Sequence, residues 1–498
     1  MTAPAPDRNA LILYGRWERP RTTGLFGMTW GVTVFAGVLV IANILLFLFT
    51  NSLAVLAITV PISALVVGPL VARIGGRTGW ELLMLRSQFW WSKWRGETTF
   101  RGGAFGVVPG VGRMPGIAGD TRLYEYELRS GDRFGLVHLK AKNHFAVSFS
   151  IQPRGQERVD QWQINDWVAG WGDFLAQIGG VRGAVGACVV VESVPDNRSR
   201  ITAEVKRITH PDAPAYARQV MAEAAMQSEA AIVRSEVRLT LTFGRLREAE
   251  GKEVADQAAE IGRRMSSLMA SAAGAGLDAT PMTAGEWCVA PTRAYNPQLT
   301  EDLEQISGIS GEDALRWEGA GPVTSENKWD HLVHNGYRSI TWEMSAAPAG
   351  QVPANVLRPL LIPRADVRRK RVAMIYRVHN TAEAVKLVDS DYKEAMAAEQ
   401  SKKGVVAASA TVRVENTGHA RREQALGAGL TRFGMLVTAT VGPGEDLPSI
   451  RAEIEGMADS AHIGLRRCYG YQDAAFAGAL GIGIILPEYA STSSKISA

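Results

Sequence analysis

The residues best able to do chemistry in this chain lack the spacing of the common nucleotide-binding motifs. A phosphate-binding loop needs glycines followed by Lys and Ser or Thr, so that backbone N–H groups and an ammonium can cradle phosphates. The only Gly-Lys pair, Gly251-Lys252, is followed by Glu253. Gly110-Val-Gly112 and Gly274-Ala-Gly276 both lack the third glycine of a dinucleotide fingerprint. We interpret these glycines as turns.

Side chains that could act as acids, nucleophiles or metal ligands are also unsuitably spaced. His331 and His334 lie three apart, without the glutamate of a helical metalloprotease pair. Ser307 to Gly311 misses the spacing of a nucleophile elbow. The three cysteines are far apart, which favours neither a disulfide framework nor a zinc site. We therefore predict a non-enzymatic protein with no catalytic, cofactor-binding or metal-binding residues.

One dense run of basic residues could contact an anionic partner. It consists of Arg364, Arg368, Arg369, Lys370 and Arg371. Nucleic acid and anionic lipid are the partners that such a run attracts. The alternative is a solvated edge strand that its charges protect from aggregation. The net charge of +4 is small for a nucleic-acid-binding protein. Direct contact of this run with DNA is therefore neither predicted nor excluded.

The element that must position everything else is an uncharged tract from Thr22 to Ala72. A bilayer core about 30 Å thick needs about 20 apolar helical residues, so the tract is long enough for two passes. Thr50-Asn51-Ser52 is the expected turn between them. A cleaved signal peptide has a much shorter apolar core. We therefore predict a transmembrane helical hairpin over residues 23–73.

Basic residues on both sides of this hairpin predict its orientation, because Lys and Arg near the ends of a span tend to stay in the cytoplasm. They are Arg8, Arg16, Arg19 and Arg21 before the hairpin and Arg73, Arg77, Arg86, Lys93 and Arg95 after it. We expect a multi-pass protein of the cell membrane with both termini cytoplasmic and residues 1–22 as a cytosolic tail.

Residues 74–95 are rich in tryptophan and basic side chains, a combination typical of the lipid headgroup level. The predicted membrane-interface residues are Trp80, Trp90, Trp91, Trp94, Arg73, Arg77, Arg86 and Lys93. An interfacial helix fits this pattern. A soluble helix that buries its tryptophans in a core is the alternative.

The rest of the chain predicts an α+β protein: a cytosolic β-rich module over 96–152 and layered α/β subdomains over 153–280 and 281–498. Alternation at Phe145, Val147, Phe149 and Ile151 is typical of a half-buried strand. The remaining patterns predict two similar rounds of elements. The first round has a helix over 162–178, strands over 185–194 and 201–208, a helix over 213–230, a strand over 237–243 and a helix over 254–268. The second has strands over 337–344, 371–378 and 432–441 and helices over 353–361, 382–400 and 447–466.

Two segments resemble a known domain. Gly470-Tyr-Gln-Asp-Ala-Ala-Phe-Ala-Gly-Ala-Leu-Gly-Ile-Gly-Ile-Ile-Leu-Pro487 is similar to the end of the amino-terminal domain of type IV secretion assembly ATPases. Asn335-Gly-Tyr-Arg-Ser-Ile-Thr-Trp-Glu-Met344, followed by Pro353 to Leu361, is similar to an earlier part of that domain. The hairpin resembles the small PrgI-like inner-membrane subunit of the same systems. Nearly the whole chain thus resembles actinobacterial conjugative-element membrane proteins that join these two parts and lack the motor domain.

The resemblance implies an inner-membrane scaffold of a type IV secretion apparatus for conjugative DNA transfer. Its implied partners are the lipid bilayer, a separate hexameric P-loop ATPase, other inner-membrane secretion subunits and further copies of the chain in an oligomer. No catalytic residue carries over, because the chain stops where the motor domain of such ATPases would begin. Two alternatives remain: an EccE-like structural component of a type VII secretion system, and a membrane-bound enzyme with a diffuse site.

Overall fold

The structure is a computed structural model in which the chain forms two compact units. One unit contains Met1–Trp17 and Thr99–Glu488, and the other contains Glu18–Thr98 and Tyr489–Ala498. We call them the sheet unit and the helical unit. The residues described are 9–15, 17, 30–74, 77–103, 112–153, 159–196, 205, 207–210, 212–227, 233–246, 253–308, 311–348, 350–400 and 408–489. The predicted α+β class is confirmed.

The helical unit begins with two apolar helices, α1 (Trp30–Thr50) and α2 (Leu53–Val71). The link between them falls inside the expected turn, where Asn51 adopts a left-handed φ of 45° that asparagine tolerates well. Asn43 Nδ2 of α1 donates a hydrogen bond of 2.9 Å to Ser63 Oγ of α2. The two helices therefore pack against each other.

A short antiparallel pair, β2 (Arg73–Ile74) and β3 (Arg77–Thr78), leads from α2 into α3 (Gly79–Trp94). Thr78 caps α3 because its hydroxyl accepts a hydrogen bond from the Glu81 N–H. The Glu81 carboxylate in turn accepts one from the Thr78 N–H. This reciprocal capping box satisfies donors that the first helical turn leaves free.

The sheet unit is built on one sheet of 13 strands, counted over the described residues. The order along its main path is β4-β11-β12-β13-β16-β15-β8-β9-β7-β6-β5, and every neighbouring pair in that path is antiparallel. Segments 96–152, 153–280 and 281–498 all contribute strands to it, so the sequence-based division into three parts lies within one compact unit. The described tail also joins this unit, because β1 (Leu13–Tyr14) pairs with β14 (Val352–Pro353).

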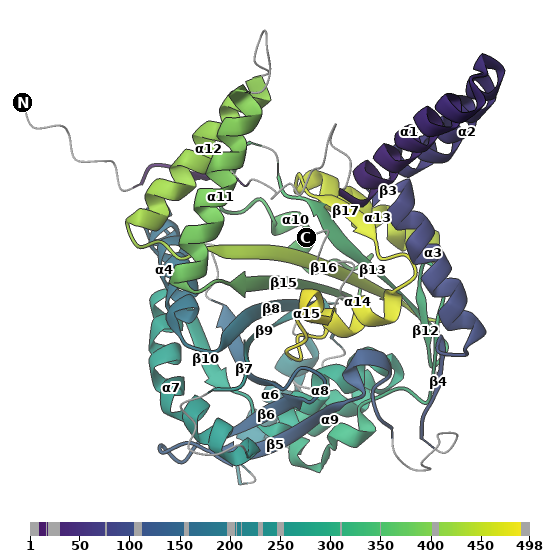
Figure 1. The fold of residues 1–498 in the computed structure, drawn as a ribbon. Helices are drawn as coiled ribbons and strands as arrows, with labels where there is room; N and C mark the ends of the chain where they lie inside the picture. The colour runs from purple at the N-terminus through teal and green to yellow at the C-terminus, as the bar shows by residue number, and fades with distance from the viewer. Residues whose placement is uncertain are drawn as a thin grey trace, which may run out of the picture. The chain divides into compact units, whose positions relative to one another are not determined.

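The strand order is symmetric about the central β8–β15 pair. Outward from this pair lie β9, β7, β6 and β5 on one side and β16, β13, β12 and β11 on the other. In each half, the strand that comes last in the chain pairs with the third strand from the centre of the sheet. Strand β10 pairs with β7, and β17 pairs with β13. The repeat in element order expected from the sequence is thus present in the topology (Figure 1).

The bounds of the elements follow the chain. Strand β4 (Thr99–Arg101) comes before the first half in the chain and pairs with β11 at the edge of the second. The first half contains β5 (Thr121–Glu127), β6 (Arg133–Leu139), β7 (His144–Pro153), α4 (Gln161–Gly180), β8 (Ala184–Pro195), α6 (Ala215–Gln227), β9 (Val233–Phe243), α7 (Val254–Gly274) and β10 (Leu277–Pro281). Helices α8 (Ala284–Tyr295) and α9 (Thr300–Gly308) then lead to the second half. It contains β11 (Thr324–Asn327), β12 (Leu332–His334), β13 (Tyr337–Ala346), α10 (Arg358–Leu361), β15 (Lys370–Val378), α11 (Thr381–Gln400), α12 (Ala408–Ala425), β16 (Thr431–Val441), α13 (Leu447–Ser460), β17 (Gly464–Arg467), α14 (Gln472–Ala479) and α15 (Leu486–Tyr489).

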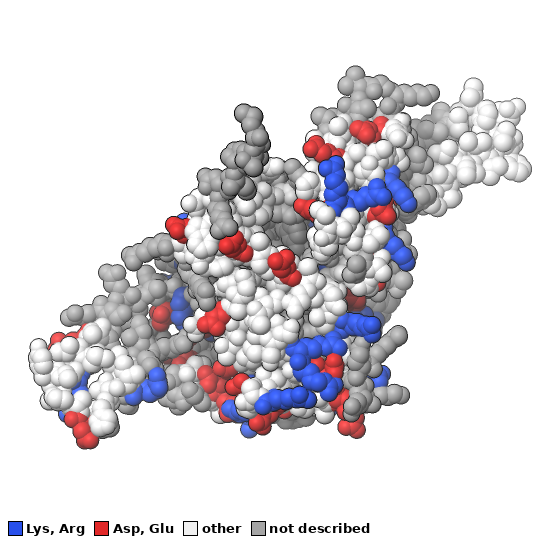
Figure 2. All heavy atoms as spheres, turned by 90° about the vertical axis from the view of Figure 1, so that its left-hand side faces the viewer, with Lys and Arg blue, Asp and Glu red and all other residues white. Residues whose placement is uncertain are grey.

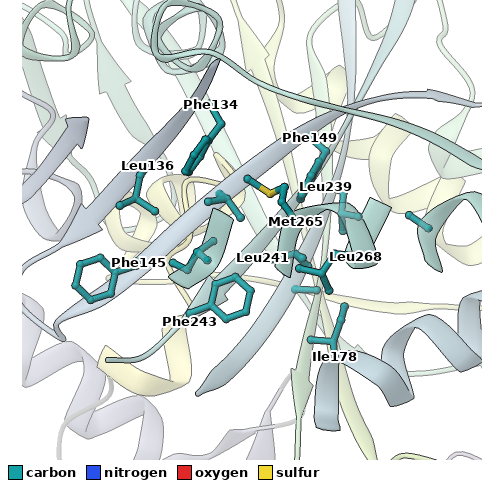
Figure 3. Packing of buried hydrophobic residues seen from close by; sticks show 14 of the residues in the cluster. Phe134, Leu136, Phe145, Phe149, Ile178, Leu239, Leu241, Phe243, Met265 and Leu268 are labelled. Atoms are coloured by element: carbon teal, nitrogen blue, oxygen red, sulfur yellow. The ribbon is translucent and has the colours of Figure 1, made fainter. Parts of the chain in front are cut away.

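One face of the sheet carries the main core. In the first half, α4 and α7 pack on it, and Figure 3 shows Ile178, Met265 and Leu268 from these helices facing Leu239 and Leu241 of β9. In the second half, α10 and α13 pack on β13, β15 and β16. The hydrophobic cluster between them includes Leu360, Ile454 and Trp342. Successive residues along a strand point to opposite faces of the sheet, so every second residue shares one face. The apolar residues at every second position of these strands therefore reach this core.

The opposite face is covered by α8, α14 and the chain that follows α14. Ala475 and Ala479 of α14 pack with Cys188 of β8. Gly481 and Gly483 then lie against the sheet with positive φ values of 70° and 89°. A Cβ on Gly481 would collide with Val190, and one on Gly483 with Ala146, so this close approach requires glycine.

Three of the predicted elements differ from the structure. Of the helix expected over 353–361 only Arg358–Leu361 is helical, and Pro353 belongs to β14. The helix expected over 447–466 ends at Ser460, where His462 adopts a φ of 55°, and Gly464–Arg467 forms β17. This segment is a strand because it pairs with β13. The spacing of apolar residues within a short segment carries no information about such pairing. The strand expected over 201–208 falls mostly outside the described residues, and Val205, Arg207 and Ile208 are helical.

A chain of buried hydrogen bonds runs between β12, β13 and β16. His334 Nδ1 lies 2.8 Å from the Tyr295 carbonyl oxygen and must donate to it, because a carbonyl only accepts. Nε2 then accepts from the Ser339 hydroxyl at 2.8 Å, and Ser339 accepts from the Thr440 hydroxyl at 2.8 Å. This arrangement requires the neutral imidazole. Burial lowers the pKa of His334 to about 4.

This histidine should make the protein less stable in acid. An unfolded histidine takes up a proton near pH 6.5, whereas His334 in the folded protein does so only near pH 4. The stabilisation is therefore complete above pH 6.5, falls with pH, and is fully lost below about pH 4, a loss of about 3 kcal/mol. Denaturant unfolding between pH 7 and 4 should show a shallower pH slope in His334→Asn. The same slope in both proteins would contradict this. His210→Asn, at a side chain 73% exposed, is the control.

Candidate functional site

The surface of α1 and α2 is apolar and free of charge. Val38, Leu48, Phe49 and Leu65 are between 56% and 88% exposed. Figure 2 shows a stretch of surface at the upper right that bears no acidic or basic side chains, whereas acidic and basic side chains are mixed elsewhere on the visible surface. A large exposed apolar surface marks contact with a membrane or another protein.

Only one described helix is long and apolar enough to cross a membrane. It is Val32–Thr50, with a mean hydropathy of 2.7 over its most apolar part. The Leu53–Pro69 segment of α2 is apolar but shorter. The two-pass topology expected from the sequence therefore rests on α2, which at 1.5 Å per residue is about 28 Å long.

Helix α3 presents its tryptophans to the outside of the helical unit, since none of its residues is buried. Trp80 is 38% exposed, Trp90 75%, Trp91 59% and Trp94 77%. The alternative of tryptophans packed in a core does not match this exposure. Of the predicted basic partners, Arg86 and Lys93 are exposed and Arg77 is half-buried, whereas the Arg73 side chain lies outside the described residues.

If α3 lies at the lipid headgroups, as the sequence predicts, brominated lipids should quench its tryptophans. In vesicles that contain brominated phosphatidylcholine, we expect changing Trp90, Trp91 and Trp94 together to Phe to remove most of the quenched fluorescence. The fold should be retained because these side chains are exposed. Trp162→Phe, at a tryptophan 40% exposed on α4, is the matched control and should leave the quenched signal unchanged. Equal loss in both variants would contradict the interfacial placement of α3.

The basic run of the sequence does not form one surface. Arg364 and Arg368 are exposed and Arg369 is half-buried, but Lys370 and Arg371 are only 2% and 4% exposed. The edge-strand interpretation is wrong, because β15 pairs with β16 on one side and β8 on the other. A run of charged residues usually lies in solvent, whereas this run enters the middle of the sheet.

Lys370 and Arg371 point to opposite faces of this central strand. Lys370 Nζ donates a hydrogen bond of 2.9 Å to the Ile362 carbonyl, beside Met457 of α13. Burial, reinforced by nearby Arg364, lowers the pKa of the Lys370 ammonium to about 8. Arg371 instead lies over the Phe476 ring at 5.2 Å, on the face that α14 covers.

A buried ion network surrounds Glu192 on that second face. Its carboxylate lies 2.9 Å from Arg238 Nη1, 3.2 Å from Arg293 Nη2 and 3.4 Å from Arg371 Nη2. Burial alone would raise the pKa of Glu192, but the three guanidinium groups hold it well below its ordinary value. The carboxylate is therefore ionised at neutral pH.

The network extends outward through further pairs. Arg293 also binds Glu236, and Arg234 binds Glu236 and Glu304. Burial would raise the pKa of Glu236, but Arg293 and Arg234 lower it to about 2. These residues are far apart along the chain, so no sequence motif joins them. One sign of a buried charge is an acidic residue at the end of an apolar run, such as Glu192 directly after Cys188 to Val191.

Comparison with known proteins bears on the helical unit. A family model described as a domain of unknown function (DUF8461) matches residues 21–81. The match covers α1, α2, the β2–β3 pair and the start of α3, and the sheet lies outside it. No curated protein matches the chain.

Proposed function

We propose that this protein is a non-enzymatic inner-membrane scaffold of a type IV secretion apparatus for conjugative DNA transfer. In this proposal α1 and α2 cross the bilayer as a hairpin, α3 lies at the headgroups, and both termini are cytoplasmic. The sheet unit then docks a separate hexameric P-loop ATPase and neighbouring inner-membrane subunits. The observation that carries the proposal is an uncharged, exposed pair of apolar helices in the same chain as a large sheet.

The two segments that resemble the secretion ATPases, on which the choice of system rests, lie side by side in the sheet unit. Asn335–Met344 spans most of β13, and Gly470–Pro487 contains α14. Gln472 joins them, because its Oε1 accepts from the Thr341 N–H at 2.8 Å and its Nε2 donates to the Thr341 carbonyl at 3.1 Å. The two segments thus belong to one structural feature, as expected if both derive from the same domain.

Topology can be tested with introduced cysteines, because Cys188, Cys288 and Cys468 are buried and should label slowly. Asn51→Cys lies between the helices and should react with a membrane-impermeant maleimide in intact cells. Leu426→Cys, at a side chain 88% exposed at the end of α12, should react only after permeabilisation. Labelling of the second variant in intact cells would overturn the proposed orientation.

The partner can be tested by crosslinking and mass spectrometry in native membranes. We expect crosslinks from the sheet unit to a P-loop ATPase and no ATP hydrolysis by the purified protein. ATP hydrolysis by the pure chain would overturn the non-enzymatic role. Crosslinks to subunits of a type VII machine in place of that ATPase would favour the EccE-like alternative.

A further inference from the structure

A small pocket lies where the two halves of the sheet meet. Its walls include Glu192 of β8, Arg293 of α8, Arg369 just before β15, Arg371 in β15, and Thr438 and Thr440 of β16. Its volume of about 20 Å³ has room for about one particle the size of water. Because its walls come from β8 on one side of the symmetry axis and from β15 and β16 on the other, a bound particle would touch both halves.

Several buried donors around this pocket have no partner within the part of the chain that the structure describes. They are Arg371 Nε and Nη1, Arg293 Nε and Arg369 Nε. Arg371 is only 4% exposed and Arg293 only 5%, so bulk water does not solvate them. Buried donors are nearly always hydrogen-bonded, and each exception calls for an explanation such as an ion.

The charges around the pocket are also unbalanced. The described network holds four arginines, Arg234, Arg238, Arg293 and Arg371, against three glutamates, Glu192, Glu236 and Glu304. Arg369 adds a further cation to the wall. Burial lowers the pKa of Arg371, and Glu192 opposes this shift while Arg238 and Arg293 add to it. Excess buried positive charge is costly unless an anion neutralises it.

We propose that this pocket binds a small inorganic anion, held by the free N–H groups of Arg293, Arg369 and Arg371. Guanidinium groups are well suited to this, because they stay charged and present several donors in a plane. Chloride is the closest in size to this pocket among the common inorganic anions, whereas inorganic phosphate requires its walls to open. Binding would stabilise the folded sheet by linkage.

The test uses the full-length protein in a non-ionic detergent. Chloride, bromide or inorganic phosphate is titrated at constant ionic strength, with a bulky organic sulfonate as the replaced anion, and the melting temperature is measured. We expect a saturable rise of a few degrees with at least one of the three anions. In Arg369→Gln the concentration for half the effect should rise at least tenfold. Arg368→Gln removes the same charge from the exposed neighbouring residue and should behave like the wild type.

Two results of this titration would overturn the proposal. One is the absence of a saturable effect from all three anions, and the other is an equal response of Arg369→Gln and Arg368→Gln. Circular dichroism confirms that each variant is folded. Bromide then locates the site without any variant, because crystals grown in bromide should show an anomalous peak beside Arg371. A saturable shift with no such peak there would place the anion elsewhere and reject this pocket.

Discussion

Replacing Glu192 with glutamine should lower the free energy of unfolding by about 3–5 kcal/mol, the cost of breaking a buried ion pair from one side. Glutamine has nearly the same shape, so the change removes the charge without leaving a cavity. Arg238, Arg293 and Arg371 would then remain buried beside a neutral amide. Urea unfolding of the full-length protein in detergent, followed by circular dichroism, measures the loss.

The matched control is an acidic residue in a solvated ion pair. Asp313 lies 3.1 Å from Arg133 Nη2, and its side chain is 57% exposed. Water screens such a pair, so Asp313→Asn should cost less than about 1 kcal/mol. Similar losses in both variants would mean that the Glu192 network contributes no more than a surface contact.

A charge placed in the middle of α1 should release the protein from the membrane. Val40 is 59% exposed near the centre of this helix, and arginine at the centre of a spanning helix costs about 2.5–3.5 kcal/mol. That corresponds to a fall of about 100-fold in partitioning for the helix. Carbonate extraction of membranes should therefore recover much more Val40→Arg than wild type in the soluble fraction.

Two further variants make this result specific. Val412→Arg places the same charge at a side chain 50% exposed on α12, outside the helical unit, and should extract like the wild type. Ile58→Arg places it at a side chain 62% exposed within α2. If α2 also crosses the bilayer, Ile58→Arg extracts like Val40→Arg. Wild-type extraction of Ile58→Arg would limit the protein to one pass.

Most individual elements could be predicted from the sequence, because helices and strands follow patterns that span only a few neighbouring residues. The alternation at Phe145, Val147, Phe149 and Ile151 predicted the core-facing side of β7, and the structure confirms that strand. The uncharged tract predicted the apolar helices α1 and α2. The topological repeat was also visible in the order of these elements.

The tertiary structure alone decided which strands are neighbours, and with them the charge network. The sequence predicts that Arg371 is in a basic run that contacts solvent or an anionic partner, yet in β15 it lies directly opposite Glu192 of β8, 179 residues away along the chain. Arg293 reaches the same carboxylate from α8. The register between distant strands depends on packing over the whole sheet. The sequence by itself therefore determined the apolar segments and most of the elements, whereas only the assembled sheet turned scattered charges into one buried network and pocket.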